Sequence, residues 1–167
     1  MIIYHPAFDA CHGALRAFAI CNAVGRTLEV EKLQIVDFYL VFPEHLASFR
    51  LPRKFVKWKS FSKKMSGEYK NSQYQKTLFA SYVKTSRISL EMLLSKGLID
   101  ASAFRDGRVE LLEVDGCEEL VSLSDEFDNR TNGYFKFISQ LADEVSLYGK
   151  NGMKDRSGLL EYRNDVL

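Results

Sequence analysis

The sequence predicts a small, mainly helical protein with a winged-helix-like core, and three observations lead to this prediction. Hydrophobic residues make up 46% of the 167 residues, which is enough for one core without disulfide or metal support. Apolar residues recur at helical spacing in several long stretches. Near the middle of the chain a helix that ends at a glycine precedes a turn and a Val/Leu-rich segment, the order in which a winged helix ends. We expect a single domain over 1–167, with a winged-helix-like core at about 8–114 and a C-terminal helical arm at about 116–167.

The first helix is expected from Ala10 to about Val24, after a short extended lead-in. Asp9 can cap its N-terminus with a side-chain oxygen, and Gly25 can end it in the left-handed conformation. The helix is apolar enough to be buried, and His12, Arg16 and Asn22 are its polar exceptions. Helical spacing assigns its core stripe to Cys11, Leu15, Phe18, Ala19 and Asn22.

A second helix is expected from about Glu29 to Leu40, with Thr27 as its cap. Phe42-Pro43 should stop it, because the residue before a proline is pushed out of the α region. Residues 44–49 are expected to form a short third helix, which gives a helix-turn-helix-like unit. The expected core stripe of the second helix is Val30, Leu33, Ile35, Val36 and Tyr39 or Leu40.

Residues 50–76 form a basic segment with nine lysines or arginines and one acid, Glu68. Aromatic residues interleave with these bases, so the segment can follow a phosphate backbone and stack on nucleic-acid bases. It can equally meet an acidic protein partner, or be a solvated loop whose aromatics cover the core. The candidate binding residues are Arg50, Arg53, Lys54, Lys57, Trp58, Lys59, Lys63 and Lys64.

A long helix should then run from about Gln75 to Lys96 and end at Gly97. Asp106-Gly107 predicts a turn that leads into a strand over 109–114, and these form the expected wing hairpin. Residues 110–128 contain eight acids and no base. This acidic stretch would repel DNA, and we expect it to form a solvent-exposed face. A final helix is expected from about Thr131 to Tyr148, followed by a Gly-rich, charged tail.

The chain contains no phosphate-binding loop, no dinucleotide fingerprint and no serine-hydrolase elbow, so we expect no catalytic residues and no cofactor. His5, Asp9, Cys11 and His12 are residue types that bind zinc. Cys11 and His12 point about 100° apart on a helix, so we expect no metal site. Glu68 and Lys70 match the Glu-x-Lys part of a nuclease motif. They lie among loop-forming residues, whereas the motif requires a strand.

The N-terminus lacks the basic region of a signal peptide, and no apolar run approaches the roughly 20 residues that a membrane helix needs. We therefore expect a cytoplasmic protein without a membrane partner. The three cysteines are too few and too widely spaced for a disulfide framework, so reduced thiols are expected. The formal net charge of +1 favours neither nucleic acid nor membrane as a partner.

Four segments spread over nearly the whole chain are IIYHPAFDACHGALRAF, LQIVDFYLVFP, SLEMLLSKGLID and NGMKDRSGLLEYRND. Together they resemble the middle component of bacterial ABC-three-component conflict systems, most closely the small C subunit of Lamassu-type defence systems. Cys11, Gly13 and Asn164 depart from the subgroup pattern. The family-like positions are His5, Pro6, Asp9, His12, Arg16, Asp37, Phe38, Tyr39, Phe42, Pro43, Lys154, Arg156, Glu161, Tyr162 and Arg163.

The resemblance implies a non-catalytic, winged-helix-like adaptor that sits beside an SMC-like coiled-coil ATPase and a nuclease-type effector. It implies DNA contact either directly or through the ATPase, which senses foreign DNA. The charged tail residues Lys154, Arg156, Glu161, Tyr162 and Arg163 are the candidate partner contacts. Two other functions stay open: a free-standing winged-helix DNA-binding regulator, and a small nuclease that acts through Glu68 and Lys70.

Overall fold

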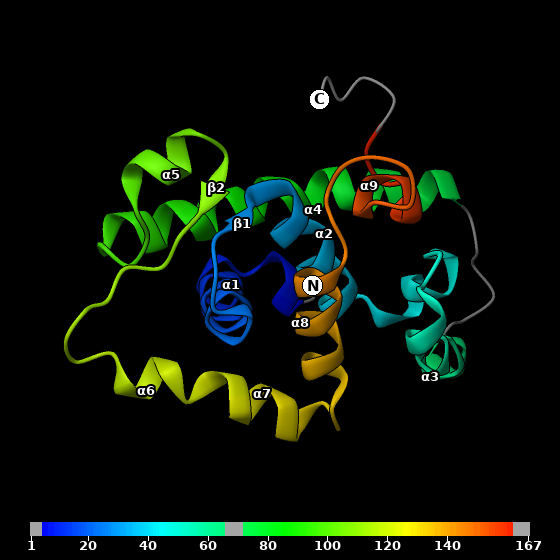
Figure 1. Cartoon of the computed structure of the whole chain (residues 1–167), viewed down its shortest axis with the longest axis horizontal. Helices are drawn as coiled ribbons and strands as arrows, with labels where there is room; N and C mark the ends of the chain where they lie inside the picture. The colour runs from blue at the N-terminus through cyan, green and yellow to red at the C-terminus, as the bar shows by residue number, and fades with distance from the viewer. Residues whose placement is uncertain (1–4, 66–71, 162–167) are drawn as a thin grey trace.

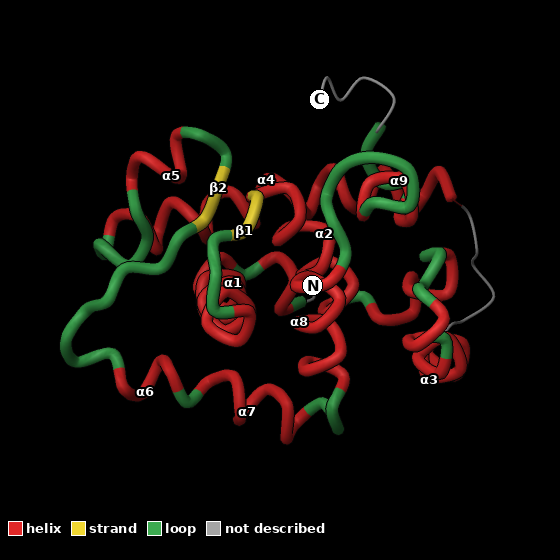
Figure 2. The backbone as a smooth tube through the Cα atoms, viewed as in Figure 1, coloured by secondary structure: helices red, strands yellow, loops and turns green. Residues whose placement is uncertain are grey.

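The computed structural model describes residues 5–65 and 72–161, and helices dominate this part of the chain (Figures 1 and 2). Four helices supply most of the core: α1 (Ala10–Val24), α2 (Val30–Val41), α4 (Ser72–Ser95) and α8 (Tyr134–Glu144). The long helix α4 runs across the upper half of Figure 1 behind α2, and α8 lies below it, packed against α2 and α1. The prediction of a mainly helical fold is confirmed.

Helix α1 has the predicted bounds and the predicted caps. The Oδ1 atom of Asp9 accepts a hydrogen bond from the backbone N–H of His12 at 3.0 Å, and Gly25 adopts a φ of 69° at the C-cap. The predicted core stripe of this helix is confirmed at Phe18 and Ala19 and wrong at two other positions, because Cys11 is exposed and Leu15 is 37% exposed. The buried face runs through residues 13–14 and 16–21, which include three alanines and Arg16.

Gly13 marks the place where α1 approaches α4 most tightly. A Cβ atom added at Gly13 would lie 2.2 Å from the Oγ atom and 3.1 Å from the Cβ atom of Ser89. Real Cβ atoms essentially never come within 3.0 Å of another heavy atom, so a larger residue here requires the Ser89 hydroxyl to rotate and the Ser89 Cβ to move by a few tenths of an ångström. The close approach explains why a small residue occupies a position where a larger one was expected.

Replacing Gly13 with alanine is expected to lower the free energy of unfolding by about 1–3 kcal/mol, because overpacking forces α1 and α4 apart. The higher helix propensity of alanine offsets about 1 kcal/mol of this cost. Urea unfolding monitored by circular dichroism measures the change. A Gly13→Ala/Ser89→Gly double variant removes the clashing atoms and should recover most of the packing loss. A Gly13→Ala variant more stable than the unmodified protein would contradict the tight approach.

Helix α2 ends at Val41, directly before Phe42-Pro43, as predicted. Its N-cap residue is Glu29, and Thr27 contacts the Glu110 carboxylate at 3.3 Å instead of capping the helix. The expected third helix is the 3₁₀ helix η2 (Pro43–Ser48), which is followed by η3 (Arg53–Phe55) and α3 (Lys57–Met65). Pro43 suits the start of η2, because an N–H at the first helical position would have no partner within the helix.

The short sheet differs from the expected wing hairpin. Strand β1 (Leu28–Glu29) pairs antiparallel with β2 (Arg108–Val109), and an isolated bridge joins Ile99 to Leu111. The Asp106-Gly107 turn follows helix α5 (Ala101–Arg105) and leads directly into β2. In the described part of the chain, this sheet thus joins two segments far apart in sequence. The winged-helix arrangement is not confirmed.

The acidic stretch forms two short helices, α6 (Glu118–Val121) and α7 (Leu123–Arg130), which run along one edge of the molecule in Figure 1. The final helix expected over 131–148 is the shorter α8, and α9 (Met153–Ser157) follows in the tail. The hydrophobic core takes residues from both the expected core segment and the expected C-terminal arm, from Ala7 to Leu159. The proposed division at about 114–116 stays a prediction.

Candidate functional site

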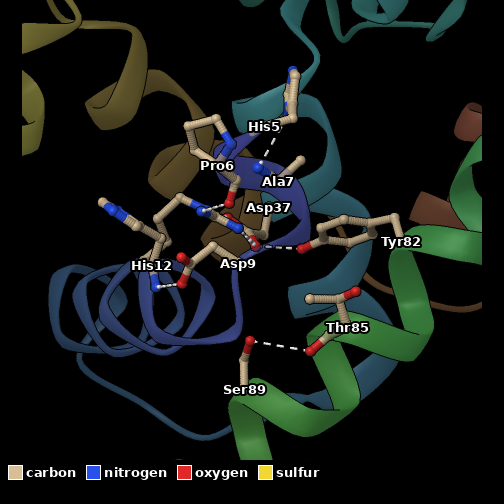
Figure 3. A network of polar contacts seen from close by, with 10 residues as sticks. His5, Pro6, Ala7, Asp9, His12, Asp37, Tyr82, Thr85 and Ser89 are labelled. Carbon is tan, nitrogen blue, oxygen red and sulfur yellow. Dashed lines mark hydrogen bonds and ion pairs between the residues drawn. The ribbon is translucent and has the colours of Figure 1, made fainter. Parts of the chain in front are cut away.

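A buried polar network connects the first helix to α2 and α4 (Figure 3). The guanidinium of Arg16 donates from Nε to Asp37 Oδ1 at 2.8 Å and from Nη2 to Asp37 Oδ2 at 3.2 Å. Its Nη1 atom donates to the backbone carbonyl of Pro6 at 3.1 Å, and the hydroxyl of Tyr82 donates to Asp37 Oδ2. The network therefore joins the lead-in segment, α1, α2 and α4 through one bidentate ion pair.

The network is closed to solvent. The exposed fractions are 7% for Arg16, 3% for Asp37 and 0% for Tyr82. Burial, the largest single influence, lowers the pKa of Arg16, but the charge attraction and hydrogen bonding of Asp37 and Tyr82 together outweigh it and raise the pKa. Burial and the neighbouring Asp37 charge raise the pKa of Tyr82 well above its ordinary value, so this phenol stays protonated as a donor.

Several family-like positions meet around this network. His5 accepts a hydrogen bond from the Ala7 N–H through Nδ1 at 3.1 Å and stacks on Phe42 with ring centroids 5.2 Å apart. Asp9 caps α1, and Arg16 pairs with Asp37. These positions are therefore engaged in holding four segments of the chain together. Among residues 5–65 and 72–161, no three His, Cys, Asp or Glu side chains gather as a metal-binding group.

Three aromatic residues of the basic segment pack against α8. Trp58 stacks on Phe137 with ring centroids 5.0 Å apart, and Phe61 stacks on Tyr134 at 4.9 Å. Phe55 is buried and meets Phe137 edge-on at 5.3 Å. The sequence left open whether these aromatics bind nucleic acid or cover the core, and these three side chains cover the core.

The basic side chains of this segment occupy several environments. Lys54 forms an ion pair with Glu144, and the Lys57 ammonium lies 5.6 Å from the Trp58 ring centroid. Helical periodicity puts lysines on both sides of the stripe formed by Trp58 and Phe61. Exposed cations are Arg50, Arg53, Lys54, Lys57, Lys63 and Lys64, and Lys59 is half-buried. Glu68 and Lys70 lie outside the described residues.

The tail residues divide between internal contacts and exposed positions. Lys154 is 6% exposed, pairs with Glu31 at 2.8 Å and lies 5.1 Å from the Tyr148 ring centroid. Its ammonium is thus used inside the fold, which was not expected for a partner contact. Glu161 is exposed, whereas Tyr162 and Arg163 lie outside the described residues.

Arg50 and Arg156 come together although they belong to two separately predicted binding regions. The backbone N–H of Arg50 donates to the Arg156 carbonyl at 3.0 Å, and the Arg156 guanidinium donates back to the Arg50 carbonyl. The Arg50 guanidinium also pairs with Asp155 Oδ1 at 2.6 Å. This two-way contact fixes α9 against the start of the basic segment.

Sequence reasoning missed three residues that the structure brings to these places. Tyr82 completes the buried network, Asp155 pairs with Arg50, and Lys136 on α8 faces the basic segment. Spacing along one helix cannot reveal such partners because each comes from a distant element. Lys136 carried one signal, since it is the only cation in the amphipathic 134–144 stretch.

The structure defines a mainly helical protein with a buried ion-pair network and an exposed basic helix, and within the described residues no helix is long and apolar enough to cross a membrane. The family model for "ABC-three component (ABC-3C) system Middle Component 5" matches residues 2–165. The chain therefore belongs to this family, and the predicted resemblance is confirmed. As a middle component it works with the other components of such a system. No curated protein and no solved structure matches the chain.

Proposed function

We propose that this chain is a non-catalytic, cytoplasmic adaptor subunit of an anti-phage or anti-plasmid defence complex of the Lamassu type. It links an SMC-like coiled-coil ATPase, which senses DNA, to a nuclease-type effector. The observation that carries the proposal is the family match over residues 2–165, which makes the chain a middle component of a multi-component system. The winged-helix character of the core belongs to the same proposal.

The arrangement of charge supports a role in binding. The exposed lysines of α3 and the acidic residues of α6 and α7 lie on different elements, so the chain offers surfaces of opposite sign. Complementary charge steers association and selects partners more than it adds affinity. Two such surfaces suit a subunit that holds two different neighbours.

A second function, a free-standing DNA-binding regulator, is favoured by one observation: α3 carries four lysines and no acid. Against it, Phe55 is buried, and Trp58 and Phe61 each stack on an aromatic ring of α8 and are only partly exposed for base stacking. The two functions differ in what binds the chain first, a protein or a duplex.

The test is a pull-down of the tagged chain co-expressed with the genes that neighbour it, read by mass spectrometry. We expect recovery of a large coiled-coil ATPase, with or without the effector. Nuclease treatment before capture removes indirect bridging by DNA. Recovery of the chain alone, or of DNA with no protein partner, would refute the adaptor function and support the regulator.

A further inference from the structure

A cavity of about 560 Å³ opens between the basic segment and α8. Three lysines, Lys54, Lys57 and Lys136, line it together with one acid, Glu144. The lysines come from two elements that are far apart in sequence, so the cavity exists only in the folded chain. Because Lys54 already pairs with Glu144, the cavity keeps an excess of positive charge.

The wall of this cavity is apolar and well supported. Trp58 stacks on Phe137 with the rings inclined by 19°, and it meets Tyr134 edge-on at 5.6 Å. Gly133 turns the chain into α8 with a φ of 82° and lies beside the Trp58 ring. The aromatic surface is thus fixed before a ligand binds, which lowers the entropy lost on binding.

A second cavity, of about 430 Å³, lies on the other side of Lys136 and is lined by Asp125, Asp128 and Asp143. Lys136 and Gln140 line both cavities, so a narrow ridge of α8 separates the basic cavity from the acidic one. Asp143 pairs with Arg26 at 2.7 Å, and Asp128 accepts a hydrogen bond from the Lys136 N–H. With Asp125, the three carboxylates still leave this cavity an excess of negative charge. A nucleic-acid strand carries negative charge at every phosphate and would be repelled beside the ridge. A protein segment can place acidic side chains in the basic cavity alone.

We propose that the cavity formed by Lys54, Lys57, Trp58 and Lys136 binds an acidic segment of a partner protein and discriminates against nucleic acid. The carboxylates of such a segment pair with the lysines, and its apolar side chains pack on the Trp58 ring. The acidic cavity beyond the ridge repels a continuous polyanion. This inference deepens the proposed adaptor function and rests on it for its biological meaning, since it names the chemistry of one partner.

The test uses the isolated full chain, so its result does not depend on whether the complex forms. Trp58 is the only tryptophan, which makes its fluorescence a direct reporter of the cavity. An acetylated glutamate-rich peptide with spaced leucines is titrated at low salt, beside a single-stranded oligonucleotide of equal net charge. We expect the peptide to change Trp58 fluorescence saturably and to bind at least about tenfold more tightly than the oligonucleotide.

A Lys57→Glu/Lys136→Glu variant should lower peptide affinity about tenfold, because two attractive contacts become repulsive. The matched control is Lys76→Glu/Lys96→Glu, one exposed lysine on α4 and one directly after it, with the same change of net charge. Circular dichroism verifies the fold of both variants, and Lys57→Gln/Lys136→Gln serves if reversal prevents folding. The proposal is overturned if the peptide does not bind, if the oligonucleotide binds as tightly, or if the control variant loses the same affinity. If the peptide does not bind, a positive pull-down still supports the adaptor function. If the pull-down recovers no partner, peptide binding at the cavity can still be observed.

Discussion

An Arg16→Met variant is expected to lose about 3–5 kcal/mol of free energy of unfolding, the largest effect of any single substitution considered for this chain. The reason is that Asp37 would keep its buried charge without the guanidinium that pairs with both of its oxygens. Pro6 would also lose the donor to its carbonyl, which ties the lead-in segment to α1. Urea unfolding at pH 7.5, fitted to a two-state transition, measures the loss.

Two comparisons separate this ion pair from a general effect of removing arginine. Arg87 pairs with Glu91 on the surface of α4, and an exposed pair of this kind contributes about 0–1 kcal/mol. Arg87→Met should therefore change stability little. An Arg16→Met/Asp37→Leu double variant removes both charges and should be more stable than Arg16→Met alone. A single variant that loses no more than the Arg87 control would contradict the structural role of the network.

Reversal of four lysines in α3, as Lys57→Glu, Lys59→Glu, Lys63→Glu and Lys64→Glu together, is expected to reduce recovery of the protein partner in the pull-down at least about tenfold. Like charges placed against each other across an interface cost several kcal/mol. The loss should shrink in high salt, because screening weakens exposed charges. Quantitative mass spectrometry of the captured complex provides the measurement.

The control for this reversal carries the same change of charge elsewhere, at Lys76, Lys84, Lys96 and Lys150, all of them exposed. Circular dichroism and thermal unfolding establish that both variants fold. If the quadruple variant does not fold, the double variant Lys57→Glu/Lys64→Glu replaces it. These two lysines lie on the same side of α3. Unchanged partner recovery by the α3 variant would remove this helix from the interface. Partner recovery unchanged together with lost DNA binding would favour the regulator instead.

Local sequence signals predicted the elements that depend on neighbouring residues. Asp9 and Gly25 defined α1 because caps act within one turn, and Phe42-Pro43 ended α2 for the same reason. The core stripe of α1 was predicted only in part, at Phe18 and Ala19. Small residues and Arg16 occupy its buried face, and their burial depends on Ser89 and Asp37 in other helices.

The candidate site was predictable only in part. The basic composition of 50–64 pointed to a binding surface, yet the packing of Trp58 on Phe137 required the position of α8. Lys154 looked like a surface charge because lysine is rarely buried, and its pairing with Glu31 shows why the composition misled. Contacts between elements that are distant in sequence determine these environments, and such contacts cannot be inferred from a single sequence.

The adaptor account is tested most directly by asking whether the ATPase and the effector associate without this chain. The neighbouring genes are co-expressed with a tag on the ATPase, once with this chain present and once with its gene removed. The account predicts that the effector copurifies with the ATPase only when the chain is present. Equal recovery of the effector in both preparations would contradict a linking role.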